Sequence, residues 1–95
     1  MRLNPLEKQD ILTVILSLDA EATVYLFGSR TDDFKQGGDI DLLVISQILT
    51  WDHKRLIRNG ICDKIGEQKI DILISKDEAT PFVIKAIKTG IKLNE

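Results

Sequence analysis

The chain has 95 residues, of which 43% are hydrophobic and 29% are charged. That size and apolar content are typical of one compact domain, so we expect a single domain over residues 1–95. Thirteen Lys and Arg against 15 Asp and Glu give a formal charge of −2. This balance argues against general binding to nucleic acid, because proteins that neutralise phosphates carry an excess of positive charge.

The sequence lacks the features of a membrane span or a secretion signal. The N-terminus has no apolar core, and no run approaches the roughly 18 uncharged residues that a spanning helix needs. Cys62 is the single cysteine, so no internal disulfide forms, and with one histidine, His53, too few sulfur and nitrogen ligands remain for a zinc cluster. We therefore expect a cytoplasmic protein that binds no membrane.

The N-terminal part of the chain predicts a helix followed by a strand. Asn4, Pro5 and Glu7 form a helix start, because asparagine caps free N–H groups, proline suits the first turn and glutamate takes the capping-box position. The helix is expected over residues 5–18, with one buried face formed by residues at helical spacing: Leu6, Ile11, Leu12, Ile15, Leu16 and Leu18. Residues 23–27 are mostly β-branched or aromatic and predict a buried strand.

The middle of the chain predicts a turn-rich connection, a strand and a second helix. Residues 29–38 are polar, and a short helix is expected from Ser29. Residues 39–45 are apolar after two carboxylates, which is typical of a central strand covered on both faces. Residues 50–65 predict an amphipathic helix, weakened by Gly60, whose residues available for packing are Trp51, Leu56, Ile57, Ile61 and Ile65.

The C-terminal part predicts one more strand and one more helix. The strand covers residues 69–74, and the helix covers residues 81–89, from the start at Thr80 and Pro81 to the stop at Gly90. The order of elements predicts an α/β (α+β) fold in which three strands form one mixed sheet backed by helices.

Asp39 and Asp41 are the first candidates for a functional site. Residues two apart in a strand point to the same face, about 6–7 Å apart along the backbone. Two ionised carboxylates in one place repel each other unless solvent or a cation compensates, and Mg²⁺ prefers oxygen ligands of this kind together with phosphate oxygens. The alternative interpretation is a solvated strand edge or turn cap.

Gly28 and Ser29 follow the first predicted strand and precede the short predicted helix. In such a place glycine lets a phosphate approach the backbone, and the helix start offers N–H donors. An ordinary strand-to-helix turn is the alternative. Asp71 is a third acid, between Ile70 and Ile72 in a stretch otherwise suited to burial, and a buried acid needs a partner.

These residues together resemble the nucleotidyltransferase superfamily that includes DNA polymerase beta, most closely its minimal single-domain bacterial members. The superfamily pattern is a Gly-Ser, a short gap, an Asp-x-Asp and a third acid on a later strand. Here Gly28-Ser29 is followed after nine residues by Asp39-Ile40-Asp41, and Asp71 comes later. The resemblance extends over most of the chain, from the leading helix to the closing one.

The resemblance implies a two-metal nucleotidyl transfer in which Asp39, Asp41 and Asp71 are the catalytic and metal-binding residues. The ions would be Mg²⁺, with Mn²⁺ as a substitute, and ATP would be the substrate. Asp39 and Asp41 would hold both ions, and Asp71 would complete the second site and help to deprotonate the acceptor. Metal ions in such sites neutralise charge that develops on the attacking and leaving oxygens.

The resemblance also implies that Gly28, Ser29 and Arg30 bind the nucleotide, Ser29 through its hydroxyl and backbone N–H and Arg30 through a charge-assisted contact to phosphate. A solvated loop arginine is the alternative for Arg30. Asp32 and Asp33 depart from the family pattern, because they put two negative charges beside the predicted phosphate site.

Minimal members of this family are commonly the antitoxin of a toxin–antitoxin pair, whose partner is a helical HEPN-domain ribonuclease. The resemblance therefore implies transfer of a nucleoside monophosphate, most often AMP, to a hydroxyl of a protein or small molecule. The alternative is a noncatalytic module of the same fold that neutralises the HEPN partner by contact. The nucleotide base, the acceptor and self-association of the chain stay open.

Three groups of residues lie outside the motif. His53 is interpreted as a surface histidine and Cys62 as a small core residue, since no basic neighbour marks an activated thiol. Lys54, Arg55 and Arg58 form a small basic helical face, which is either solvated or meets a negatively charged partner or substrate.

Overall fold

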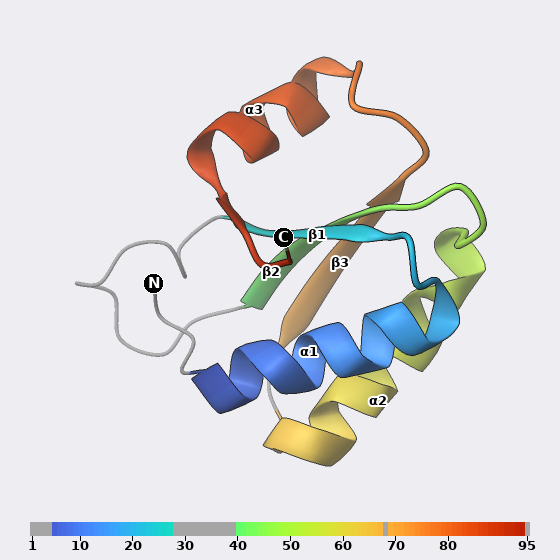
Figure 1. The fold of residues 1–95 in the computed structure, drawn as a ribbon, viewed down its shortest axis with the longest axis vertical. Coiled ribbons are helices and arrows are strands. Elements are labelled where there is room, and N and C mark those ends of the chain that lie inside the picture. Colours follow the sequence, from blue (N-terminus) through green and yellow to red (C-terminus); the bar gives the residue numbers. More distant parts are fainter. Residues whose placement is uncertain (1–4, 28–39, 68, 95) are drawn as a thin grey trace.

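A computed structural model of the chain describes residues 5–27, 40–67 and 69–94. Figure 1 shows how the elements are arranged. In chain order they are α1 (Pro5–Leu18), β1 (Thr23–Phe27), β2 (Ile40–Ile45), the short 3₁₀ helix η2 (Trp51–His53), α2 (Lys54–Ile65), β3 (Ile70–Ser75), α3 (Pro81–Thr89) and β4 (Ile91–Lys92). The predicted α+β fold with a mixed sheet is confirmed. The short helix predicted from Ser29 and the cap predicted at Asn4 lie outside the described residues.

The sheet has the strand order β3-β2-β1-β4. β2 runs parallel to β3 and antiparallel to β1, and β1 runs antiparallel to β4. The central position of β2 explains its nearly continuous apolar sequence, because both faces of a central strand are covered. The prediction of three strands was wrong, since β4 pairs Leu26 with Ile91 and Tyr25 with Lys92. Two residues are too few to show the alternation that marks a strand in a sequence.

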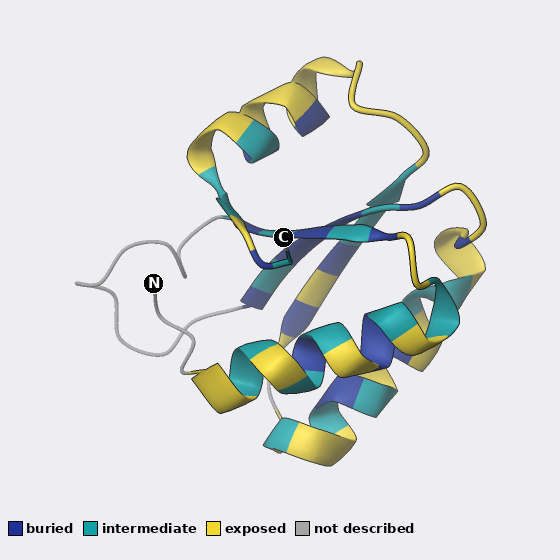
Figure 2. Cartoon of the chain, in the orientation of Figure 1, coloured by how far each residue is buried: buried dark blue, intermediate teal, exposed yellow. Residues whose placement is uncertain are grey.

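Helices cover both faces of the sheet, α1 and α2 on one side and α3 on the other (Figure 1). Alternate residues of the strands belong to the two cores. Leu42 and Val44 pack with the buried residues of α1 and α2, whereas Leu43 packs with Val83 and Ala86 of α3. Figure 2 shows that burial is concentrated where the helices face the sheet.

Leu6, predicted on the buried face of its helix, is exposed, and so are Trp51 and Leu56, which were predicted to be available for packing. Leu6 is 74% exposed, Trp51 74% and Leu56 55%. Helix α2 packs through Ile57 and Ile61, which are fully buried and one helical turn apart, so Leu56 lies beside that stripe rather than on it. Trp51 precedes α2 in η2, and Leu6 is in the first turn of α1, ahead of the first buried residue of that helix.

Gly60 allows α1 and α2 to approach each other closely. A Cβ atom at this position would lie 3.0 Å from Cγ1 of Val14 on α1. Val14 is a core residue that the sequence analysis did not single out. The glycine that weakens α2 as an isolated helix is therefore accommodated because it improves the packing of two helices.

Gly90 ends α3 because of a close backbone contact and not because of its backbone angle, since its φ is −92°. A Cβ atom there would lie 2.5 Å from the carbonyl oxygen of Ala86 and 2.6 Å from that of Leu26. The chain then continues along β1, where the Asn94 side chain accepts a hydrogen bond from the backbone N–H of Val24 at 2.9 Å. Residues 90–94 are thus held against β1.

Two buried or half-buried polar side chains organise the connection between β2 and α2. The Ser46 hydroxyl donates to the carboxylate of Asp19 and accepts from the backbone N–H of Leu49 at 2.9 Å. Nδ1 of His53 accepts a hydrogen bond from the backbone N–H of Thr50 at 2.9 Å. His53, predicted to be a surface residue, is half-buried and caps η2.

Among the described helices, none combines the length and apolar character required to cross a bilayer.

Candidate active site

Asp41 and Asp71, two of the three predicted metal-binding carboxylates, lie side by side on neighbouring strands. The parallel pairing of β2 and β3 places Asp41 opposite Asp71 in register. The backbones of adjacent strands are about 4.8 Å apart, and side chains on one rung point to the same face. The fold therefore brings together two acids that are far apart in the sequence.

Both acids are on the face of the sheet that α3 covers. Successive side chains of β2 point to opposite faces of the sheet, so Asp41 is on the same face as Leu43, which packs against α3. Asp41 is half-buried and Asp71 is exposed. Ile70 and Ile72 on either side of Asp71 are buried, as the sequence predicted, whereas Asp71 points to the other face of the edge strand β3 and is exposed. The carboxylate of Asp71 is therefore accessible from that face.

The chemistry of this pair fits a magnesium ion. Carboxylate oxygens are the ligands that Mg²⁺ prefers, and the ion commonly takes one or two of them and completes its shell with water and phosphate oxygens. Like charges directly opposite each other on paired strands are unfavourable without such compensation. Within residues 5–27, 40–67 and 69–94, no cluster of three or more acidic, His or Cys residues could hold a metal. The described residues supply two carboxylates at this place, Asp41 and Asp71, and Mg²⁺ is commonly held by one or two.

The remaining residues of the predicted site are outside the described part of the chain. They are Gly28, Ser29, Arg30 and Asp39, together with the acids Asp32 and Asp33 that depart from the family pattern. The described residues on either side of this segment meet at the site. Phe27 is opposite Asp41 in the pairing of β1 with β2, and Ile40 directly precedes Asp41. The roles predicted for residues 28–39 stay predictions.

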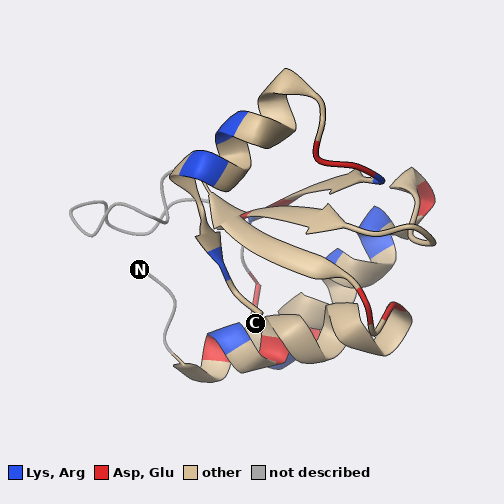
Figure 3. Cartoon of the chain, turned by 45° about the horizontal axis from the view of Figure 1, so that its top comes forward, with Lys and Arg blue, Asp and Glu red and all other residues tan. Residues whose placement is uncertain are grey.

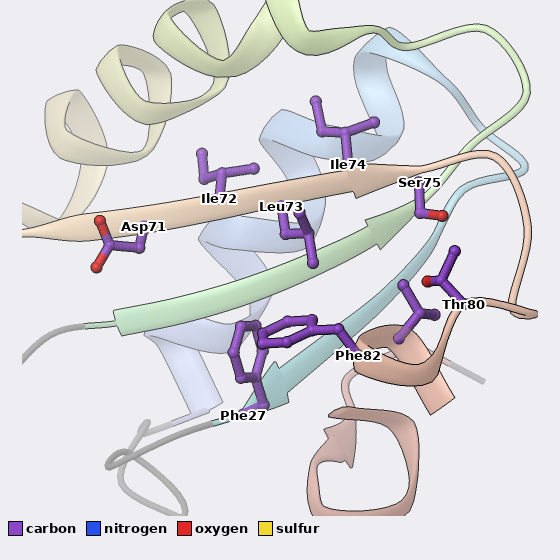
Figure 4. A pocket seen from close by; sticks show the side chains of 9 residues that line it. Phe27, Asp71, Ile72, Leu73, Ile74, Ser75, Thr80 and Phe82 are labelled. Carbon is purple, nitrogen blue, oxygen red and sulfur yellow. The ribbon is translucent and has the colours of Figure 1, made fainter. Parts of the chain in front are cut away.

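A hollow of about 390 Å³ adjoins Asp71 on the α3 side of the sheet. Figure 4 shows its lining, with Ile72 and Ile74 on one side of β3 and Leu73 on the other. The rings of Phe27 and Phe82 meet edge to face in this hollow, with centroids 5.9 Å apart and an interplanar angle of 84°. The complete lining is Phe27, Asp71, Ile72, Leu73, Ile74, Ser75, Thr80, Phe82 and Val83.

No sequence pattern indicated this hollow. Phe82 directly follows the proline that begins α3, and an aromatic residue there carries no signal of its own. Its significance depends on where α3 packs, which is a property of the tertiary structure. Cys62, by contrast, is half-buried and packs against the core, as predicted.

Residues 9–95 match the family model described as "Polymerase beta, Nucleotidyltransferase". The chain belongs to this family. The match includes every described strand and both acids of the site, and it indicates nucleotidyl transfer as the general class of reaction. No curated protein sequence matches this nucleotidyltransferase domain significantly. The resemblance that the Gly-Ser and Asp-x-Asp pattern indicated is thereby confirmed at the level of the family.

Proposed function

We propose that this nucleotidyltransferase domain moves a nucleoside monophosphate, AMP from ATP, onto a hydroxyl of a protein or small molecule in a reaction that depends on Mg²⁺ or Mn²⁺. The observation that carries the proposal is the in-register pair of Asp41 and Asp71 on an accessible face of the sheet, in a chain of the polymerase beta family. Two carboxylates on neighbouring strands supply the oxygen ligands that Mg²⁺ prefers.

The acids have two tasks in this proposal. Asp41 and Asp71, with Asp39, hold Mg²⁺, which when bound neutralises negative charge on the transferring phosphate and on the attacking and leaving oxygens. Asp71 is the more exposed of the two described acids, so its carboxylate is also suited to accept the proton of an approaching acceptor hydroxyl. Gly28, Ser29 and Arg30 bind the terminal phosphates.

The hollow beside Asp71 supports a nucleotide as the substrate. Its lining is mainly apolar, and it presents the rings of Phe27 and Phe82 next to the acid pair. Aromatic side chains stack on nucleobases, and the hydroxyl groups of Ser75 and Thr80 offer polar contacts within the same lining. A nucleotide with its phosphates at the acids would have room for its base there.

Ligand binding tests the nucleotide site separately from catalysis. ATP with Mg²⁺ should raise the melting temperature of the protein, because a ligand that binds the native state alone stabilises it, by about 2.7 kcal/mol at a hundred times its dissociation constant. Asp39→Asn should reduce the shift, whereas Glu67→Gln, an exposed acid after α2, should preserve it. The absence of any shift at millimolar ATP and Mg²⁺ would contradict the proposal.

A transfer assay tests the reaction and the partner. We propose that the acceptor is a small helical HEPN-domain protein and that the chain acts as its antitoxin. Incubation of the two proteins with ATP and Mg²⁺ should add the mass of AMP to the partner, as measured by intact-protein mass spectrometry. Asp39→Ala with Asp41→Ala should abolish the adduct without unfolding the domain. An adduct that persists in this variant would show that the acids have been assigned wrongly.

The second candidate function is neutralisation of the HEPN partner by contact alone. Asp32 and Asp33 favour it, since negative charges near a phosphate site weaken binding of a triphosphate. The same double variant separates the two candidates. If the partner is still neutralised by the variant and no adduct forms with either protein, contact is the function.

A further inference from the structure

A second hollow, of about 260 Å³, lies between α2 and the edge strand β3. Three of its six lining residues are basic: Lys54, Arg55 and Arg58 of α2 line it together with Ile70, Asp71 and Ile72 of β3. Figure 3 shows basic residues of α2 in blue. Asp71 and Ile72 also line the apolar hollow on the α3 side, so the edge of β3 separates the two.

The positive charge in this hollow is local. The chain as a whole carries a formal charge of −2, yet the three basic side chains gather beside one acid, Asp71. Among the described residues, Lys54, Arg55 and Arg58 take part in no ion pair. Cations brought together in this way repel each other unless a negatively charged group lies between them.

The edge of β3 offers a second kind of contact. β3 is an end strand of the sheet, and within the described residues its pairing is with β2 alone. The backbone N–H and C=O groups on its outer side are therefore available to an added strand, which is how extended peptides bind to sheet edges. A strand added along Ile70–Ile72 would lie about 4.8 Å from Asp71.

We propose that the edge of β3 and this basic hollow dock an extended acidic segment of a protein acceptor, whose hydroxyl-bearing residue faces Asp71. The segment alternates its side chains between the two faces of the sheet, as any strand does. A serine, threonine or tyrosine on the α3 side is thus flanked in sequence by acidic residues on the α2 side, where Lys54, Arg55 and Arg58 are. The inference rests on the proposed function and names the acceptor class for that site.

The transfer step forms one phosphorus–oxygen bond and breaks another. The acceptor oxygen forms a bond to the α-phosphorus of ATP, and the bond from that phosphorus to the bridging oxygen breaks. Pyrophosphate leaves with the electron pair of that bond, and the hydroxyl proton passes to the carboxylate of Asp71. Docking at the neighbouring edge presents the hydroxyl to this carboxylate from the open side of the sheet.

An acidic peptide fits this surface better than a nucleic acid does. The basic area is confined to three residues on about one turn of helix, with Asp71 in the same hollow and Asp63 later on the same helix. A nucleic acid strand would need positive charge over a longer track. It would also make no use of the open hydrogen-bonding edge of β3, which only an extended polypeptide can pair with along its length.

Binding of short fluorescent peptides, measured by anisotropy without ATP, tests the docking directly. Peptides with a central tyrosine and glutamates on both sides should bind, and matched peptides with lysines in place of the glutamates should not. Arg55→Glu with Arg58→Glu should weaken binding of the glutamate peptide at least about tenfold, consistent with loss of close charge pairs. Lys64→Glu is the control, because Lys64 is on the same helix but lines a different hollow with α1.

A charge exchange gives the sharper test. The double variant should bind the lysine peptide in preference to the glutamate peptide and, with ATP and Mg²⁺, should add AMP to it. If the double variant fails to fold, the single variant Arg58→Glu serves, and it should shift the preference in the same direction. Equal binding of both peptides by the wild type would overturn the inference, as would single-stranded RNA binding more tightly than the glutamate peptide and losing affinity in the variant.

Failure of the docking inference can be distinguished from failure of the proposed function. A thermal shift with ATP and Mg²⁺, together with failure of every peptide to bind, would support the nucleotide site and overturn the proposed docking of an acidic segment. Peptide binding that responds to Arg55 and Arg58, without any nucleotide binding, would support the docking and contradict the proposed reaction.

Discussion

Replacing Asp71 with asparagine should have opposite effects on stability in the absence and presence of Mg²⁺. Without the ion, the substitution removes one of two like charges that face each other on β2 and β3. Lys54, Arg55 and Arg58 line a hollow with Asp71 but form no ion pair with it among the described residues, so the repulsion from Asp41, directly opposite, is taken as the larger effect. Such opposed charges cost about 0.2–1 kcal/mol across strands. Coulomb's law for charges separated by the strand spacing of about 4.8 Å gives about 0.9 kcal/mol in water, and the water value is the appropriate one because Asp71 is exposed.

Urea denaturation with a chelator present should therefore show that Asp71→Asn is more stable than the wild type by roughly 0.2–1 kcal/mol. The gain should shrink in 1 M NaCl, where the Debye length is about 3 Å. Glu78→Gln is the matched control, since it removes the same charge from an exposed position in the segment after β3, and it should leave stability within about 0.5 kcal/mol of the wild type.

With Mg²⁺ and ATP added, the order should reverse, because the wild type gains binding free energy that the variant lacks. A loss of more than about 1 kcal/mol in the metal-free variant would show that the Asp71 carboxylate makes structural contacts, which would refute the repulsion argument. Full retention of the Mg²⁺-dependent stabilisation in Asp71→Asn would refute its role in holding the ion.

Three further substitutions test a close backbone contact, a buried hydrogen bond and the apolar hollow beside Asp71. Gly90→Ala should destabilise the domain by about 1–3 kcal/mol in urea denaturation, because its Cβ would meet two carbonyl oxygens at 2.5 and 2.6 Å; unchanged stability would refute the close contact. Ser46→Ala should cost about 1–3 kcal/mol, since it removes the buried hydroxyl bonded to Asp19, whereas Ser46→Thr should cost less. Phe82→Ala should weaken ATP binding in a titration by about 1–3 kcal/mol through loss of a stacking surface, while Phe82→Tyr should retain it; equal affinity in Phe82→Ala would place the base elsewhere.

Local sequence was sufficient to predict the secondary structure around the site. The helices at residues 5–18 and 81–89 have the predicted bounds, because proline at the first turn and helical spacing act within a few residues. Thr80 makes no side-chain capping hydrogen bond. The strand at 23–27 was predicted from its β-branched and aromatic residues, which is also a local signal. The strand predicted at 69–74 is shifted by a single residue. The family followed from short motifs at characteristic spacing, and the family match confirms it.

Relations between distant segments were decided by the tertiary structure. The sequence identified Asp41 and Asp71 as candidates, but only the parallel register of β2 with β3 makes them neighbours. Ile70 and Ile72 are buried, as their apolar character indicated, whereas Asp71 between them points to the other face of an edge strand and is exposed. Pairing of strands is a long-range contact, and its register depends on how whole faces pack rather than on any one residue.

The surroundings of the acids were likewise determined by packing. Helix α3 brings Phe82 to Phe27, and α2 brings three basic residues to the edge of β3. Sequence by itself determined which residue types were available and which segments became helices and strands, because periodicity, caps and turns are local properties. The tertiary structure decided which of those residues share a surface, because burying the apolar faces of the helices against a sheet fixes where their remaining side chains lie.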